Sequence, residues 1–220
     1  MKFQNKLIFS DTETTGKDQK DFIQIIQSAS VLTDQDYNIQ DSMNVSCAPL
    51  PWVVPSPGAY LTHKKIETLS SSDTHYQMMK TIHDQWKNWS NDDPAIFITY
   101  NGHNFDEELY RRQFFWNLMD PFVTNTNGNG RSDLLMLTRL VSQLFPKMLD
   151  FEINANGYPV CSLSSVAERI GIDTANAHDA LSDCIFMIEL LKFFHSSAEN
   201  LVTDFLSQGT KQGCAEFLRK

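Results

Sequence analysis

The sequence predicts an α/β protein in which helices pack against a mixed β-sheet. Three observations predict this class. Apolar runs of strand-like composition occupy the first part of the chain, and two of them flank a turn, as in a hairpin. Another strand-like run follows a helical segment, and most of the remaining chain has apolar residues at helical spacing. With 220 residues, of which 41% are hydrophobic, the chain can bury one core, so we expect a single domain over residues 1–220.

The expected elements follow the order β-β-β-α-β-α-α-α-α. Strands are expected at residues 7–11, 23–33, 37–47 and 95–100. Helices are expected at residues 75–89, 105–119, 134–145, 163–170 and 177–194, with two short helices around Gly209 within residues 201–218. Residues 49–58 and 124–130 are expected to form loops, because they are rich in proline, glycine and asparagine.

The composition argues against several broad classes. No apolar run approaches the roughly 20 residues that a membrane span needs, and the N-terminal apolar segment is too short for a secretory signal. The four cysteines are scattered, which is typical of reduced thiols, so we expect a cytoplasmic protein that is not attached to a membrane. The net charge of −9 weighs against a large basic surface for nucleic acids. It does not exclude a nuclease, because metal-binding carboxylates add to the negative count.

Two carboxylates stand at the end of the first apolar run. Side chains alternate along a strand, so Asp11 and Glu13 would point to the same face. Two like charges side by side are costly unless a cation lies between them, and hard divalent ions prefer oxygen ligands. The pair alone would also fit an ordinary polar strand end. A metal site therefore depends on further carboxylates in the chain.

Two later segments supply such groups. Asp106 follows the strand at residues 95–100 and starts the next helix; functional groups gather at such strand ends, but a helix dipole also favours an acid there. The other segment contains His178 and Asp183. A helix would place these two about 140° apart around its axis, so they share one site only if His178 lies on the loop before the helix. Asp179 is an alternative to Asp183 for the acidic role.

Three motifs in this order resemble those of the DEDDh-type 3′→5′ exonucleases. They are Asp-Thr-Glu-Thr-Thr-Gly at residues 11–16, Asn-Phe-Asp at residues 104–106, and the pair His178 and Asp183. More closely, most of residues 6–195 is similar to the nuclease domain of the bacterial exonuclease I family. Stretches that support this similarity include Pro57-Gly58-Ala59, Asp120-Pro121, Arg131-Ser132-Asp133 and Asn176-Ala177-His178.

The resemblance implies an RNase H-like fold, with a mixed five-stranded sheet flanked by helices. It implies that two Mg²⁺ or Mn²⁺ ions are held by Asp11, Glu13, Asp106 and Asp183. His178 would be the general base, a role that a histidine of ordinary pKa can fill at neutral pH. Two ions could then stabilise the attacking and leaving oxygens of a phosphodiester. Asp133 is expected to be structural, and residues 196–220 to form short helices outside the motif-bearing core.

A 3′→5′ exonuclease must hold a terminal nucleotide. Thr14, beside Glu13, could bond the terminal sugar, and Leu61 and Phe105 could stack on or wedge beside terminal bases. For Leu61 and Phe105 a place in the core is an equal alternative. Cations that could meet phosphates, although each also fits a solvated surface, are Lys64, Lys65, Arg111, Arg112 and Arg131.

The chain departs from the exonuclease I family in two respects. Ser162 stands where that family has a basic residue, so one phosphate contact lacks its counterpart. That family also continues into further domains that enclose the strand, whereas this chain ends where its nuclease domain would end. We therefore expect distributive degradation, with products spread over many lengths.

The complete motif set predicts a metal-dependent 3′→5′ exonuclease that acts on single-stranded DNA, releases 5′-mononucleotides and serves DNA repair. An RNA substrate is the alternative, as in exoribonucleases of the RNase T or oligoribonuclease type. A proofreading enzyme bound to a polymerase is another, with Phe205-Leu206 and Phe217-Leu218 as weak docking candidates. A single-strand-binding protein is a further candidate partner. A non-catalytic nucleic-acid-binding domain would be supported by a broken motif, and none is broken.

Overall fold

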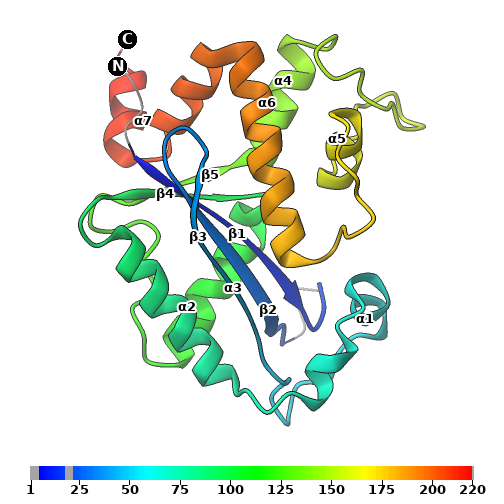
Figure 1. Cartoon of the computed structure of the whole chain (residues 1–220), viewed down its shortest axis with the longest axis vertical. Coiled ribbons are helices and arrows are strands. Elements are labelled where there is room, and N and C mark those ends of the chain that lie inside the picture. The colour runs from blue at the N-terminus through cyan, green and yellow to red at the C-terminus, as the bar shows by residue number, and fades with distance from the viewer. Residues whose placement is uncertain (1–4, 18–21, 220) are drawn as a thin grey trace.

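A computed structural model describes residues 5–17 and 22–219 and shows a mixed five-stranded sheet with helices on both faces (Figure 1). The strands are β1 (Lys6–Thr14), β2 (Ile25–Thr33), β3 (Ile39–Ser46), β4 (Ala95–Thr99) and β5 (Gly130–Asp133). Their order across the sheet is β3-β2-β1-β4-β5. The first three pair antiparallel, whereas β4 runs parallel to β1 and β5 parallel to β4. The predicted mixed sheet is confirmed.

The helices surround this sheet. They are α1 (Pro57–His63), α2 (His75–Ser90), α3 (Asp106–Trp116), α4 (Leu134–Leu144), α5 (Leu163–Arg169), α6 (Ala180–Ser207) and α7 (Lys211–Phe217). Short 3₁₀ segments lie at Ile66–Ser70 (η1) and Gly102–Asn104 (η2). Within the described residues, no helix is both long enough and apolar enough to cross a bilayer.

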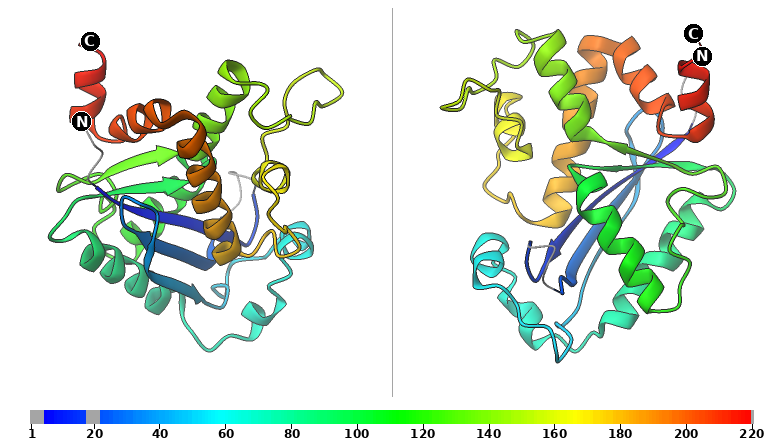
Figure 2. Two further views of the ribbon diagram at one scale, coloured as in Figure 1. Left: turned by 45° about the horizontal axis from the view of Figure 1, so that its top comes forward. Right: turned by 180° about the vertical axis from the view of Figure 1, so that it is seen from behind.

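The two faces of the sheet carry separate cores, because side chains alternate along β1. Leu7 and Phe9 pack with buried side chains of α4 and α6, and Ile8 packs with those of α2 and α3. Figure 2 shows α6 on one side of the sheet and α2 and α3 on the other. By the same alternation, Asp11 and Glu13 continue the face that α6 covers. The two carboxylates thus belong to a sheet face that a helix already crosses.

Three differences from the sequence-based expectations concern elements with weak local signals. The strand β5 begins at Gly130, at the end of the expected loop, because its polar residues are recruited by parallel pairing with β4. Helix α1 lies partly within the expected proline-rich loop and begins at Pro57, where proline is tolerated in a first helical turn. Helix α6 begins at Ala180 rather than at residue 177. A kink at Ala198 divides α6, and its last part, up to Ser207, together with α7 corresponds to the two short helices expected around Gly209.

Candidate active site

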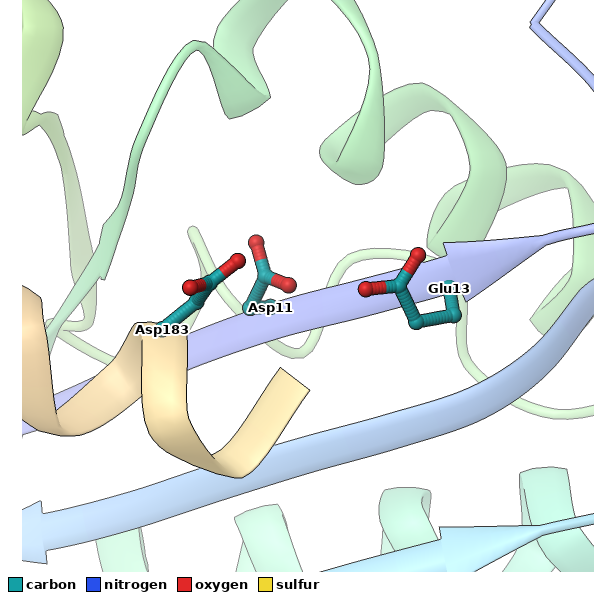
Figure 3. Close-up of side chains that lie close together, drawn as sticks. All are labelled: Asp11, Glu13 and Asp183. Carbon is teal, nitrogen blue, oxygen red and sulfur yellow. The ribbon is translucent and has the colours of Figure 1, made fainter. Parts of the chain in front are cut away.

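Three carboxylates meet where the N-terminus of α6 crosses β1. One oxygen of each of Asp11, Glu13 and Asp183 lies within 4.8 Å of the others. Figure 3 shows the three carboxylates turned toward a common space between the strand and the helix. Asp183 reaches this position from the first turn of α6, which is held against the sheet by Cys184, whose Sγ lies 3.7 Å from the carbonyl oxygen of Phe9. Three of the four predicted ligands are therefore brought together.

The fourth predicted ligand, Asp106, lies beside this group. Strand β4 pairs with β1 only as far as Phe9, and Asp106 begins α3 after the turn that follows β4. Its carboxylate is buried and accepts a hydrogen bond from the hydroxyl of Thr12, the residue between Asp11 and Glu13. Asp106 is close enough to Asp11 to raise the pKa of that carboxyl group.

Burial is the largest cause that raises the pKa of all four carboxyl groups, and repulsion from neighbouring carboxylates adds to it. The pKa of Asp11 is well above its usual range, because the group is buried and because Asp106 and Asp183 lie nearby. Burial, followed by repulsion from Asp183, raises the pKa of Glu13 to about 8. Burial raises the pKa of Asp106 and of Asp183 to about 6 each, although hydrogen bonds oppose the shift. A divalent cation would stabilise such a cluster, because it neutralises the charges of the carboxylates and prefers oxygen ligands.

His178 lies on the turn that leads into α6, as the shared site requires. Its φ of 66° is left-handed, a conformation that ends the preceding turn and starts the chain toward the helix. The side chain is exposed, and a backbone hydrogen bond joins His178 to the carboxylate of Asp183. The expected helix start at residue 177 was wrong, and His178 therefore lies on the loop before α6, which is the condition for sharing a site with Asp183.

Asp179 has a structural task that separates it from Asp183. Its carboxylate caps α6 by accepting from the Ser182 N–H at 3.1 Å, and it pairs with the ammonium of Lys65 at 2.5 Å. Burial raises the pKa of Asp179, but hydrogen bonds from Lys65, Ser182 and Gln27 outweigh it and leave the pKa below its usual value. Asp179 is thus committed to the helix cap and to Lys65, whereas Asp183 faces Asp11 and Glu13.

Residues near the end of α1 join the site to α6, and the sequence did not single out this connection. The ring of His63 is buried; its Nε2 lies 3.3 Å from the carbonyl oxygen of Thr14, and its Nδ1 accepts from the Lys65 N–H at 3.0 Å. Lys65 then reaches Asp179, and its positive charge lowers the pKa of Glu13. Between them, His63 and Lys65 tie the end of β1 to the cap of α6. The only local signal was a histidine and two lysines after a short helix.

The predicted substrate contacts fall in different surroundings. Thr14 is buried and its hydroxyl donates to the carbonyl oxygen of Gly16 at 2.7 Å. Leu61 is 78% exposed on α1, so the core alternative is wrong for this residue. Phe105 is half-buried at the start of α3. Arg131 pairs with Glu107 at 2.6 Å, which directs its guanidinium toward α3. Their contacts with a substrate stay predictions.

Asp133 is structural, as expected. It is 1% exposed, and its carboxylate accepts from the backbone N–H groups of Asn101 at 2.7 Å and Leu135 at 3.1 Å. It therefore caps α4 and fixes the turn after β4 that leads to Asp106. Ser162, the departure noted above, caps α5 by accepting from the Ser165 N–H at 3.4 Å.

The family model for the RNase_T exonucleases matches residues 8–191, and the chain belongs to this exonuclease family. Within it, the resemblance to the exonuclease I nuclease domain and the RNase H-like exonuclease fold are confirmed. The chain is 31% identical to exodeoxyribonuclease I of Buchnera aphidicola subsp. Schizaphis graminum over 93% of its own length and 42% of that relative.

Solved structures give the same result. Exonuclease I of E. coli in complex with a dT13 oligonucleotide superposes with a TM-score of 0.86 and 26% identity, over 97% of this chain and 46% of that one. A solved ExoI/SSB-Ct complex matches with a TM-score of 0.79 and 25% identity, over 91% of this chain and 43% of that one. The chain spans about half the length of the curated relatives it matches, or less.

Proposed function

We propose that the chain is a metal-dependent 3′→5′ exonuclease that hydrolyses single-stranded DNA from its 3′ end and releases 5′-mononucleotides. One observation carries this proposal: Asp11, Glu13 and Asp183 converge within 4.8 Å in a fold of the exonuclease family. Relatives named exodeoxyribonuclease I, and the solved complex with dT13, favour DNA over RNA as the substrate. Single-strand-binding protein is the partner that the ExoI/SSB-Ct complex favours.

The donor set fits two divalent ions, Mg²⁺ or Mn²⁺. Asp11, Glu13 and Asp183 would hold them, with Asp106 joining after its side chain leaves Thr12. When bound, such ions supply charge stabilisation for the attacking and the leaving oxygen. Burial and neighbouring carboxylates raise the four pKa values, and a bound cation would offset both effects by favouring the ionised groups.

His178 would take the proton of the attacking water. Its side chain is exposed, and its backbone is tied to the carboxylate of Asp183 by a hydrogen bond. The water oxygen would attack phosphorus, and the bond from phosphorus to the 3′ oxygen of the penultimate nucleotide would break. The terminal nucleotide would leave with a 5′ phosphate, and the shortened strand would gain a 3′ hydroxyl. A general base of this kind contributes about 10²- to 10⁴-fold in rate.

The end of the strand would lie between β1 and α1. Leu61 offers an exposed apolar side chain on α1, and Phe105 offers a half-buried ring next to Asp106. Thr14 uses its hydroxyl within the β1 turn, so its contact with the terminal sugar would be made through the accepting side of that hydroxyl. The role in DNA repair and the cytoplasmic location stay predictions.

The test compares matched single-stranded DNA, duplex DNA and RNA, each labelled at its 5′ end and incubated with Mg²⁺. Successively shorter labelled products from the single-stranded DNA are expected, and EDTA should stop their formation. Asp11→Asn should abolish activity, whereas Asp93→Asn, a matched carboxylate change at a side chain that is 71% exposed, should not. Undiminished degradation by Asp11→Asn would refute the site. Strand binding without any hydrolysis would instead support the non-catalytic alternative.

A further inference from the structure

We propose that α3 and the approach to β2 form a base-stacking groove for single-stranded nucleic acid, which holds the nucleotides that precede the 3′ end. The groove, of about 270 Å³, is lined by Phe22, Phe105, Glu108, Leu109, Arg112 and Trp116 among others. Its volume is near the lower end of the ~300–1,000 Å³ of small-molecule clefts, so it suits planar groups rather than a whole folded partner. The inference rests on the proposed function, because it assigns the strand that enters the same site.

An exposed aromatic pair forms one end of the groove. The rings of Phe22 and Trp116 stack with centroids 4.5 Å apart and an angle of 13° between their planes. Yet the two residues are 46% and 42% exposed, so the pair is not a part of the core. Flat aromatic faces at a surface bind nucleobases by stacking, and every base offers such a face.

The groove begins beside the candidate active site, although none of the four carboxylates lines it. Phe105 lines the groove and directly precedes Asp106 in the chain. Leu109, Arg112 and Trp116 follow Phe105 at intervals of four, three and four residues, a spacing that puts them on one face of α3. At 1.5 Å per residue this face leads about 15 Å away from Asp106. A strand whose last nucleotide lies at the carboxylates can therefore extend along α3.

The charges around the groove suit a phosphate backbone. Arg111 and Arg112 both pair with Glu108, through Nη2 in one case and through Nε at 2.7 Å in the other. Two guanidinium groups thus share one carboxylate, which leaves one net positive charge on these three side chains. Arg112 and Glu108 line the groove, and Arg111 lies outside its lining. Both arginine side chains are about half exposed, so they can reach phosphates while the rings hold bases.

The test measures how affinity depends on strand length, in an Asp11→Asn background that prevents hydrolysis. Fluorescence anisotropy gives the affinity for an oligothymidylate of about 12 nucleotides and for one of about three, which cannot fill the groove. Trp116→Ala should reduce the ratio of the two affinities about five- to 150-fold, the range that corresponds to the loss of stacking on one base. Trp116→Phe, which keeps an aromatic ring, should restore most of the ratio. Phe22→Ala, which removes the other ring of the stacked pair, should reduce the ratio as Trp116→Ala does.

Phe115→Ala is the matched control. Phe115 neighbours Trp116 on α3 and is 67% exposed, but it does not line the groove. A ratio that stays within about twofold of the parent in both Trp116→Ala and Phe22→Ala would overturn the proposal. This is the result expected if the groove binds a protein partner and no nucleic acid. An equal reduction by Phe115→Ala would overturn the proposal as well. Thermal unfolding shows whether each variant is folded. If Trp116→Ala does not fold, the affinity ratio of Phe22→Ala tests the groove proposal.

The same experiment separates the two proposals. If the unmodified protein fails to degrade DNA but its affinity depends on Trp116, the groove stands and the proposed activity is refuted. If the unmodified protein degrades DNA but Trp116→Ala leaves the affinity ratio unchanged, the activity stands and the groove is refuted.

Discussion

The ion pair between Lys65 and Asp179 should stabilise both the fold and the geometry around His178. Lys65→Met removes the ammonium but keeps an apolar stem, and Asp179→Asn removes the charge but keeps a residue that caps helices well. The double-mutant cycle built from these two changes therefore measures the pair and not the cap. Lys64→Met, at the exposed neighbour of Lys65, is the control.

The magnitude follows from the surroundings of the pair. The nitrogen and oxygen lie 2.5 Å apart, and the two side chains are only 17% and 28% exposed. Exposed pairs contribute about 0.2–1 kcal/mol, and hydrogen bonds to charged groups about 1.5–3 kcal/mol. An intermediate coupling of about 1–2 kcal/mol is expected, and the melting temperature of Lys65→Met should fall by about 2–8 °C at this chain length.

The assay is urea unfolding of the four proteins of the cycle, with hydrolysis of a single-stranded DNA measured in parallel. Because Asp179 precedes Ala180 and follows His178, a loosened cap should lower kcat more than it raises KM, and Lys65→Arg should recover part of the loss. A coupling energy below about 0.3 kcal/mol would refute the reasoning. So would a loss of kcat in Lys64→Met equal to that in Lys65→Met.

Three further predictions concern the carboxylates and their supports. In EDTA, the free energy of unfolding should decrease as the pH rises from about 4 to about 8, because Glu13, with its pKa raised to about 8, holds its proton in the folded protein longer than in the unfolded chain. Saturating Mn²⁺ should remove this decrease in thermal scans, and a flat profile in EDTA would contradict the repulsion between the carboxylates. Arg131→Ala should cost about 2–4 kcal/mol in urea unfolding, because it removes the guanidinium that pairs with the mostly buried carboxylate of Glu107 and leaves only His103, at 3.4 Å, beside it. Arg131→Lys should cost less, and equal losses would argue against the ion pair. Gly102→Ala should lower stability by about 1–3 kcal/mol and reduce kcat, because the new Cβ would lie 2.2 Å from Oγ1 of Thr99 and so shift the turn that leads to Asp106. A Gly102→Ala variant with unchanged melting temperature would show that this turn adapts freely.

Local patterns in the sequence predicted much of the architecture. The helix expected at residues 75–89 is α2 (His75–Ser90), because its apolar residues recur at helical spacing and Thr74 with Gln77 caps its start. The alternation along β1 predicted that Asp11 and Glu13 share a face, and their oxygens do lie together. Both features depend on residues close in the chain, where period and capping chemistry act directly.

Features that depend on distant residues could not be predicted in this way. The four residues of β5, Gly-Arg-Ser-Asp, form a strand only because β4 is there to pair with them. Nothing near Lys65 in the chain marks Asp179, which lies 114 positions away, as its partner. The choice between Asp179 and Asp183 likewise depended on which of them the start of α6 turns toward β1.

The sequence by itself determined the class of the fold, the pair of carboxylates on β1 and, through its motifs, the residues that complete the candidate site. The tertiary structure decided how these residues are placed. It put His178 on a turn, Asp106 against Thr12, Arg131 against Glu107, and an exposed aromatic stack beside the path to Asp106. The reason is physical: strand and helix periods are local properties of the chain, whereas ion pairs, caps and stacks between distant segments exist only after the chain has packed.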